Sequence, residues 1–273
     1  PLSKYAKKWG ITVIMDFPSI SHEQAMEMGI KETKLGIRTK IKERQYIDYA
    51  LFCSRFAAET YKYRTSAKKD FVLHVGADFR SAAANLQNRE GSDSLKIAFI
   101  ANMEFRKGLD ILLRAYSLLP FKKELYLIGK INKKWVADFC KEQSIDISGI
   151  NFTGSLSQAE LVDYLISRQV DLHILPSRFD SFGMVVPETM MLGIPNILSP
   201  YVGAGELVEK ETDGFIMSSL DPESLVEEIN KYRSLSTEDK FILRENVIKK
   251  AAKMTWEQYY QQAGQMVETI LDK

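Results

Sequence analysis

Short apolar runs alternate along the chain with segments in which apolar residues recur every three or four positions. The apolar runs predict buried strands at 10–17, 49–54, 70–78, 95–102, 124–130, 149–155, 170–177 and 195–200. The amphipathic segments predict helices at 21–35, 54–64, 108–119, 132–144, 157–168, 187–193, 221–235 and 255–273. Strands that alternate with helices of this length are typical of βαβ units. The pattern therefore predicts an α/β fold with doubly wound, Rossmann-like parallel sheets.

A polar segment without hydrophobic period divides this pattern. Residues 80–94 are small and polar, and we interpret them as a linker with a domain boundary near residue 90. Residues 91–273 hold enough strands for a complete domain, whereas 1–90 hold only about three. We therefore expect a complete C-terminal domain (91–273) beside a partial N-terminal domain (1–90). The expected chain is thus N-terminally truncated, and it begins with Pro1.

Composition narrows the class of protein. Of the 273 residues, 45% are hydrophobic and 27% are charged, which argues against wholesale disorder. The net charge of +1 argues against a nucleic-acid partner. No apolar stretch approaches the roughly 20 residues of a membrane-spanning helix. The two cysteines, Cys53 and Cys140, are too few for a disulfide framework or a four-Cys zinc site, so a reducing, cytoplasmic location is expected.

Candidate chemistry gathers where the predicted strands end. Ligands of doubly wound folds bind at the carboxyl ends of the strands. There the sequence places small residues, the cation Lys107, and the acids Asp180 and Glu188. Cations and backbone amides suit phosphate, and carboxylates suit the hydroxyls of sugar and ribose. The mixture indicates a site for a nucleotide diphosphate.

One segment carries a specific resemblance. Residues 176–196 read PSRFDSFGMVVPETMMLGIPN, with Asp180 and Glu188 eight positions apart across a glycine turn into a helix. This segment resembles the E-x7-E motif of retaining nucleotide-sugar glycosyltransferases with the GT-B fold, in particular glycosyltransferase family 4 (group 1). Further segments are similar to motifs of that family, namely VLHVGAD, ANMEFRKGLDILLRAY, LYLIGK, INFTGSLSQAEL, DGFIM and MTWEQYYQQ.

The resemblance implies roles for individual residues. Glu188 would accept hydrogen bonds from the donor's ribose, Asp180 would face the transferred sugar, and Lys107 would neutralise the diphosphate. The segment DFPSISH is similar to D-R-G-S-x-H, which would place Asp16, Ser21 and His22 on the facing wall. The implied catalytic residues are Asp180, Glu188, Lys107 and His22. The implied donor-binding set is Asn102, Arg106, Thr153, Gly154, Ser155, Leu156, Phe182, Gly183, Met184, Val185 and Glu206. Glu206 has an alternative role, which is to cap a helix through its charge.

The implied function is transfer of a sugar from a nucleotide-diphosphate-sugar donor to an acceptor, with retention at the anomeric carbon. The acceptor itself, a glycan, a lipid-linked molecule or a small molecule, stays open. No D-x-D motif is present, so no metal and no other cofactor is expected. Asn102 stands where the family has Arg, which motivates an alternative, a noncatalytic GT-B subunit that binds a partner or a sugar nucleotide. Neither the acid/base set of an epimerase nor the pyridoxal-binding lysine motif of a phosphorylase is evident.

Three further features of the sequence are a basic run, two histidines in apolar segments and the final helix. A basic run comprises Lys31, Lys34, Arg38, Lys40, Lys42 and Arg44. It is either a solvated face or a patch that holds the protein at the inner face of an anionic membrane. His74 and His173 lie in apolar strands and are expected to be core or edge residues. The final helix, 255–273, is expected to cross back to the first domain.

Overall fold

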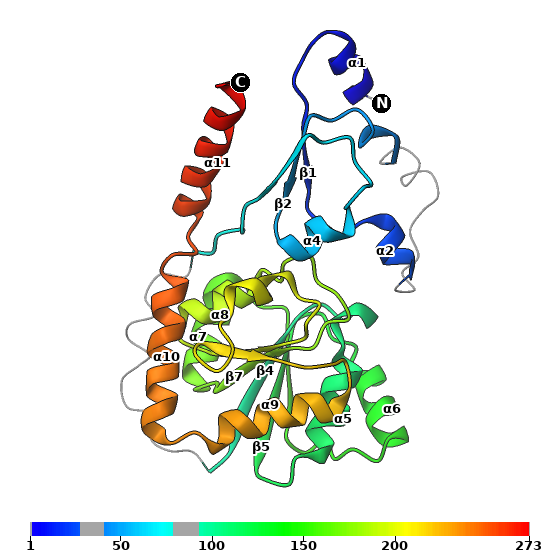
Figure 1. Cartoon of the computed structure of the whole chain (residues 1–273). Coiled ribbons are helices and arrows are strands. Elements are labelled where there is room, and N and C mark those ends of the chain that lie inside the picture. The colour runs from blue at the N-terminus through cyan, green and yellow to red at the C-terminus, as the bar shows by residue number, and fades with distance from the viewer. Residues whose placement is uncertain (1, 28–40, 79–92, 273) are drawn as a thin grey trace.

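The computed structural model describes residues 2–27, 41–78 and 93–272 (Figure 1). Two sheets lie one above the other in this view, with the smaller sheet of the N-terminal part above the larger sheet of the C-terminal part. All strand pairs in both sheets are parallel. The predicted α/β class with parallel sheets is therefore confirmed.

The larger sheet has six strands. They are β4 (Leu95–Ile100), β5 (Lys123–Ile128), β6 (Ile150–Gly154), β7 (Leu172–Leu175), β8 (Asn196–Leu198) and β9 (Gly214–Ile216). Their spatial order is β6-β5-β4-β7-β8-β9, so the direction of winding reverses between β4 and β7. Ala98 of β4 lies opposite Tyr126 of β5 on one side and His173 of β7 on the other. Such a reversal point is where doubly wound sheets bind ligands.

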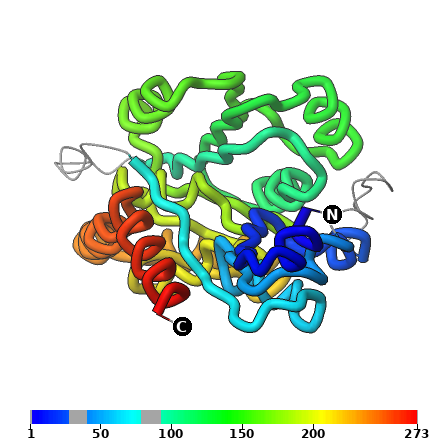
Figure 2. Tube along the Cα trace, turned by 90° about the horizontal axis from the view of Figure 1, so that it is seen from above, coloured from blue at the N-terminus to red at the C-terminus, as the bar shows by residue number. Residues whose placement is uncertain are grey.

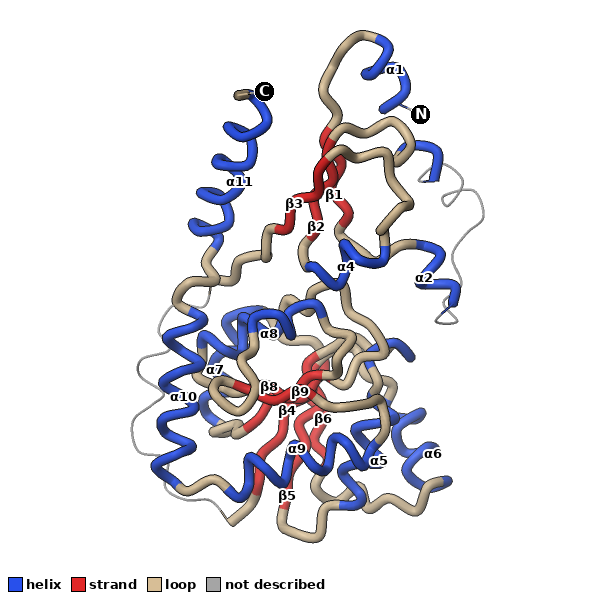
Figure 3. The backbone as a smooth tube through the Cα atoms, viewed as in Figure 1, coloured by secondary structure: helices blue, strands red, loops and turns tan. Residues whose placement is uncertain are grey.

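Helices cover both faces of this sheet because the strand residues alternate between them (Figure 3). Ile97 and Phe99 pack with α5 (Leu109–Leu118), α6 (Lys133–Glu142) and α9 (Pro222–Ser234). Ala98 packs on the opposite face with α7 (Gln158–Ser167), α8 (Val185–Met191) and α10 (Thr237–Ala251). Ser157 caps α7 through a capping box with Glu160.

The smaller sheet has three strands in the order β1-β2-β3. These are β1 (Ile14–Phe17), β2 (Tyr49–Phe52) and β3 (Lys69–Val72), and the helices of this part are α1 (Leu2–Lys8), α2 (His22–Glu27) and α4 (Arg55–Thr60). The Ser54 side chain caps α4 by accepting from the Ala57 amide. The carboxyl ends of this sheet and of the larger sheet face each other across one gap, where the site lies.

The last helix, α11 (Trp256–Leu271), rises from the C-terminal part and runs beside the segment that follows β3 (Figures 1 and 2). The Ala77 amide donates to the Met254 carbonyl at 2.8 Å. A Cβ on Gly76 would lie 2.4 Å from the Trp256 nitrogen, so only glycine permits this close approach. Gly76 therefore fixes where α11 begins.

Several sequence predictions were wrong in extent. The strand predicted at 10–17 begins at Ile14, because the Ile11 amide still donates to Ala6 and closes α1. The strand predicted at 70–78 is β3, which ends at Val72. The helix predicted at 187–193 is α8, displaced by two residues toward the N-terminus. Helices α1 and α10 and strand β9 were not predicted, and most of the predicted 80–94 linker and the second half of the predicted 21–35 helix lie outside the described residues.

In the ranges that the structure describes, no helix has the length and apolar character needed to cross a membrane.

Candidate active site

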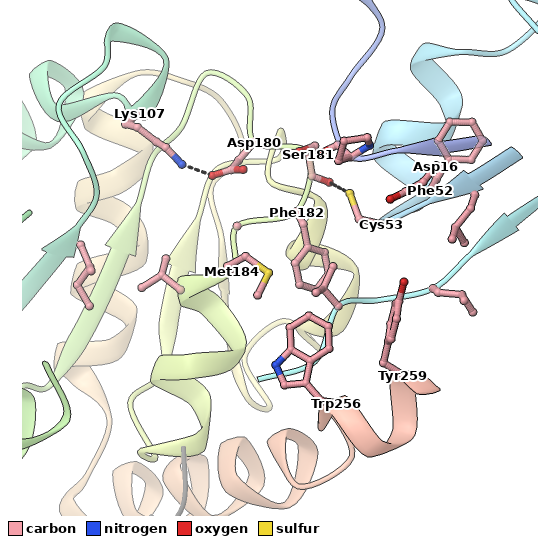
Figure 4. A pocket seen from close by; sticks show the side chains of 17 residues that line it. Asp16, Phe52, Cys53, Lys107, Asp180, Ser181, Phe182, Met184, Trp256 and Tyr259 are labelled. Atoms are coloured by element: carbon pink, nitrogen blue, oxygen red, sulfur yellow. Dashed lines mark hydrogen bonds and ion pairs between the residues drawn. The ribbon is translucent and has the colours of Figure 1, made fainter. Parts of the chain in front are cut away.

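A cavity of about 520 Å³ lies between the two sheets (Figure 4). Its C-terminal wall comes from the loops after β4 and β7 and from the start of α8, and its N-terminal wall comes from β1, β2 and the segment after β3. The first turn of α11 closes a third side. The lining residues are Asp16, Pro18, Leu51, Phe52, Cys53, Leu73, Val75, Ile100, Lys107, Asp180, Ser181, Phe182, Gly183, Met184, Val185, Trp256 and Tyr259.

Lys107 reaches the cavity because of the turn that follows β4. It is the last residue of the 3₁₀ turn η2 (Phe105–Lys107), and Gly108 follows with a φ of 71°. A Cβ at Gly108 would lie 2.0 Å from the Pro176 carbonyl oxygen. Glycine is therefore required here both for its left-handed backbone and for the close approach of the β4 and β7 loops. The motif pair Lys107-Gly108 thus places the cation directly beside the loop that carries Asp180.

Lys107 and Asp180 form an ion pair at the reversal point of the sheet (Figure 4). Their side chains are only 14% and 10% exposed, so solvent screens the pair weakly. A second cation, Arg106, lies 4.0 Å from the other carboxylate oxygen of Asp180 and also binds Glu104 at 2.6 Å. Arg106 therefore lies beside the Asp180 carboxylate but does not line the cavity, so its donor-binding role stays a prediction.

A bidentate bridge holds the two loops together. Both terminal nitrogens of Arg178 donate to the Asp110 carboxylate, at 2.8 and 2.7 Å. Arg178 also donates to the Phe105 carbonyl at 2.9 Å, and its guanidinium lies 3.8 Å from the centre of the Phe105 ring. A planar guanidinium matches a carboxylate in this parallel geometry, whereas a lysine makes a single contact. Arg178 belongs to the 176–196 motif, but the sequence alone indicates no role for it.

The backbone around Asp180 is also fixed. Its amide donates to the Tyr201 carbonyl at 2.8 Å, and its carbonyl accepts from the Gly203 amide at 2.9 Å. The predicted donor residues Phe182, Gly183, Met184 and Val185 follow in the same loop, and all four line the cavity. The structure therefore brings Lys107, Asp180 and this loop together.

Glu188 differs from Asp180 in its surroundings. It lies in α8 and does not line the cavity, and among the described residues no group hydrogen-bonds its carboxylate. Burial raises the pKa of Glu188 to about 7. A carboxyl group that is half-buried and unpaired favours its neutral form until a ligand supplies hydrogen-bond donors.

A buried hydrogen-bond network connects α8 to β7 and β8. Asn196 Oδ1 accepts from the Thr189 hydroxyl at 3.0 Å and lies 2.6 Å from His173 Nδ1. An amide oxygen can only accept, so His173 carries its proton on Nδ1. Burial lowers the pKa of His173 to about 4, and the ring is neutral. His173 is a core residue, as predicted.

Other predicted donor residues lie outside the cavity lining. Thr153 and Gly154 end β6, and the Gly154 carbonyl accepts from the Gly129 amide at 2.9 Å. Ser155 follows β6, and Leu156 packs against the core beneath α7. Asn102 is exposed and accepts from the Lys130 amide at 3.4 Å. The donor-binding roles of these residues stay predictions.

Glu206 joins the two parts of the chain. Its carboxylate accepts from the Phe56 amide at 2.7 Å and contacts His74 Nε2 at 3.1 Å. Burial alone would raise the pKa of Glu206, but these hydrogen bonds and one from the Arg55 amide lower it. The alternative role of Glu206 in capping a helix therefore has direct geometric support, although the helix is α4 of the N-terminal part.

The facing wall contains only part of the predicted set. Asp16 lines the cavity, and burial raises the pKa of its carboxyl group. Ser21 and His22 are buried and do not line it. The Ser21 hydroxyl instead accepts from the Gln24 amide at 3.2 Å, at the start of α2. A catalytic role for His22 stays a prediction.

The basic run needs one correction. Arg44 is 7% exposed and makes a bidentate pair with Glu23, so it belongs neither to a solvated face nor to a membrane patch. Lys42 is exposed, and the members Lys31, Lys34, Arg38 and Lys40 lie outside the described residues. Arg44 is buried because Glu23 neutralises it, and the Arg44 hydrogen bonds and charge in turn lower the pKa of Glu23 to about 2.

Across the part of the chain that the structure describes, no group of three His, Cys, Asp or Glu side chains is arranged to hold a metal ion. Independence from metal stays a prediction.

Comparisons with known proteins add to this picture. A family model described as "Glycosyl transferases group 1" matches residues 84–254. An uncharacterized glycosyltransferase of Methanocaldococcus jannaschii is 28% identical over 174 residues, which cover 64% of this chain and 48% of that protein. The chain thus spans about half the length of this curated relative.

Two solved structures show the same fold. Sucrose-phosphate synthase of Thermosynechococcus elongatus superposes with a TM-score of 0.79 at 18% identity, covering 98% of this chain and 70% of that one. HepE of Anabaena, solved in complex with UDP-glucose, superposes with a TM-score of 0.75 at 17% identity, covering 98% and 75%. At such identities the likeness establishes the fold alone.

Proposed function

The chain belongs to the glycosyl transferases group 1 family, and on that premise we propose that it transfers a sugar from a nucleotide-diphosphate-sugar donor to an acceptor. The fold is of the GT-B kind, as its structural neighbours are. One observation carries the proposal to this chain's own residues: the buried Lys107–Asp180 pair at the reversal point of the sheet. In one cavity, the cation can bind the phosphates of a sugar diphosphate and the carboxylate can accept hydrogen bonds from the sugar hydroxyls.

In the proposed reaction, Lys107 binds the diphosphate, and Arg106 adds positive charge nearby. Negative charge develops on the diphosphate as the bond to the anomeric carbon breaks. A fixed cation in a weakly screened site stabilises that charge more than water does. Gly108 fixes the backbone that carries Lys107, and the Lys107 side chain turns from Asp180 to the diphosphate when the donor binds.

Asp180 then exchanges Lys107 for hydroxyls of the transferred sugar, and Glu188 accepts hydrogen bonds from the ribose. Within the described ranges, the Glu188 carboxyl group has no hydrogen-bond partner, and its pKa is raised to about 7. The uncharged hydroxyls of a ribose would supply the hydrogen bonds that it lacks. The acceptor hydroxyl attacks the face that the diphosphate leaves and gives its proton to the departing phosphate oxygen, which results in retention. Retention, the donor class and the absence of metal are all part of the proposal.

UDP is the first diphosphate to test, because a structural neighbour was solved with UDP-glucose. Calorimetry with UDP, GDP, ADP and dTDP on the 273-residue chain is expected to show one clear preference. Incubation with the matching sugar nucleotide and EDTA should release the free diphosphate when an acceptor is added. Nuclear magnetic resonance of the product's anomeric proton reports whether configuration is retained.

The possible outcomes separate the candidate functions. Absence of binding by all four diphosphates at millimolar concentration contradicts the proposal. Binding of a sugar nucleotide without transfer to any acceptor in a glycan, lipid and small-molecule panel indicates the noncatalytic alternative, which Asn102 motivates. Loss of transfer in EDTA, with recovery on adding Mg²⁺, contradicts the expected metal independence alone.

A further inference from the structure

The wall that α11 contributes to the cavity is aromatic. Trp256 and Tyr259 lie one turn apart in the helix, and their rings are 5.5 Å apart with planes at 78°. Figure 4 shows both side chains turned into the cavity, opposite the loop of Phe182 and Met184. Neither aromatic residue belongs to the implied donor set. This surface therefore belongs to the cavity but has no assigned ligand.

The polar atoms of this wall are unpaired. Among the described residues, nothing hydrogen-bonds the indole N–H of Trp256 or the hydroxyl of Tyr259. Asp16 lines the cavity on the neighbouring wall, and its charge adds to burial in raising the pKa of Tyr259. The Asp16 carboxylate accepts a hydrogen bond from the backbone of Phe17 and keeps further capacity to accept. Partly buried polar groups normally have partners, so the two unpaired groups beside this carboxylate indicate a ligand with hydroxyls.

Backbone contacts at the start of α11 fix the position of this aromatic wall. Gly76 leaves no room for a side chain against the Trp256 nitrogen, and the Ala77 amide binds the carbonyl before Thr255. The Thr255 side chain then caps α11 by accepting from the Gln258 amide. Trp256 and Tyr259 are thus fixed in the first turn of a capped helix.

Resting on the proposed function, we propose that Trp256, Tyr259 and Asp16 form the acceptor subsite and that it takes a sugar ring. A sugar ring presents an apolar C–H face that suits an aromatic surface, and hydroxyls at its rim that suit the three polar groups. The donor takes the opposite wall, where Lys107 and Asp180 lie. The volume of about 520 Å³ is of the size usual for small-molecule sites.

Competing acceptors fit this wall less well. An alkyl chain would match Leu51, Phe52 and Leu73, but it would leave the indole N–H of Trp256 and the hydroxyl of Tyr259 without partners. An anionic acceptor would meet the charge of Asp16. A neutral sugar satisfies both the apolar and the polar groups.

Saturation-transfer nuclear magnetic resonance tests the subsite with methyl α-glucoside, methyl α-galactoside and methyl α-mannoside as probes and n-hexanol as the apolar rival. The spectra are recorded on the 273-residue chain with and without UDP. At least one glycoside is expected to bind, and Trp256→Ala should weaken it about tenfold or more. Trp256→Phe and Tyr259→Phe, which keep a ring and remove only the polar atom, should each weaken it about threefold to tenfold.

Matched controls lie outside the cavity. Tyr260→Phe removes a hydroxyl from a residue that is 66% exposed in the same helix, and Trp9→Phe replaces an indole that is 72% exposed. Both should leave glycoside binding unchanged, and all variants should keep the wild-type affinity for UDP. Absence of binding by every glycoside, equal binding in the Trp256 variants, or preferential binding of hexanol overturns the proposal. UDP affinity is measured separately, so glycoside binding without UDP binding contradicts the donor assignment and leaves the subsite intact.

Discussion

Arg178 binds Asp110 through two hydrogen bonds of 2.8 and 2.7 Å, and this bridge holds the loop after β7 against the first turn of α5. The Arg178 amide also donates to the Arg106 carbonyl at 2.7 Å. Lys107 and Asp180 lie on either side of this contact. The bridge therefore sets the separation of the two charges that face the cavity.

Arg178→Lys keeps the positive charge and removes the second hydrogen bond and the planar contact with Phe105. We expect the free energy of unfolding to fall by about 1 kcal/mol, because both side chains are partly exposed. Diphosphate affinity should fall about threefold to tenfold, since the loops lose their fixed separation. Urea unfolding and calorimetry measure the two effects. Arg114→Lys in the same helix α5 is the control, and an equal effect there would contradict a positioning role for Arg178.

Lys107→Ala should weaken diphosphate binding about tenfold or more and leave nucleoside binding unchanged, because the lost contact is a charge-assisted hydrogen bond to phosphate. Titration with a nucleoside and its diphosphate measures the difference. Equal losses for both ligands would mean that Lys107 only supports the fold.

Asp180→Asn should act in the opposite direction on diphosphate binding. The variant frees Lys107 from its ion pair, so affinity for the diphosphate should rise, while transfer of the sugar should fall through kcat. Calorimetry and initial rates are the two measurements. Asp180→Glu supplies the first acid of the E-x7-E motif that this segment resembles and should retain transfer. A lower diphosphate affinity in Asp180→Asn would contradict this assignment, because it would mean that the carboxylate supports binding of the diphosphate and not of the transferred sugar.

Glu188 should make nucleoside binding depend on pH. Its pKa is raised to about 7, so the neutral form predominates below that pH and the hydroxyl-accepting carboxylate above it. Affinity for the nucleoside should therefore rise as the pH increases through about 7. The same shift means that Glu188 lowers stability as the pH rises from 4.5 to about 7.

Glu188→Gln should abolish both pH effects and weaken nucleoside and diphosphate binding to the same degree. Binding curves for the nucleoside, which has no titrating phosphate, between about pH 5.5 and about pH 8.5 measure this. An unchanged pH profile in the variant would show that another group titrates.

The pair of Arg44 and Glu23 should protect the N-terminal part against acid. The pKa of Glu23 is lowered from 4.5 to about 2, so the pair stabilises the fold above pH 4.5 and loses its effect as the pH falls toward 2. Arg44→Met should lower the free energy of unfolding by roughly 2 kcal/mol at neutral pH and by less at acidic pH. Urea unfolding across this range is the test. Lys62→Met removes an exposed ion pair with Glu59 and serves as the control, with an expected change below about 0.5 kcal/mol.

The motif at 176–196 and the strand pattern predicted the larger sheet and the meeting of Lys107 with the Asp180 loop. These features follow from local patterns and from the rule that parallel strands end at one edge. Helix α10 escaped prediction because its buried residues are sparse, only Leu243, Val247 and Ala251. Strand β9 has three residues, which are too few to show an alternation of apolar and polar positions.

Contacts between distant segments could not be predicted from one sequence. Glu206 accepts a hydrogen bond from the Phe56 amide, 150 positions away, and no sequence pattern near either residue predicts this contact. Trp256 and Tyr259 carry a helical spacing that is usual for core aromatics, and only the position of α11 places them beside Asp16. Arg178 could have been noticed, because an arginine two residues before a predicted site acid suggests a nearby carboxylate.

Ser181 joins the two parts of the chain at the residue next to Asp180. Its carbonyl accepts from the Ser54 hydroxyl at 2.5 Å, and its own hydroxyl donates to the Pro18 carbonyl at 2.9 Å. The two sheets therefore cannot move apart here without pulling on the peptide next to Asp180. Any separation of the two sheets would act first on the backbone beside Asp180 and, through it, on the ion pair with Lys107.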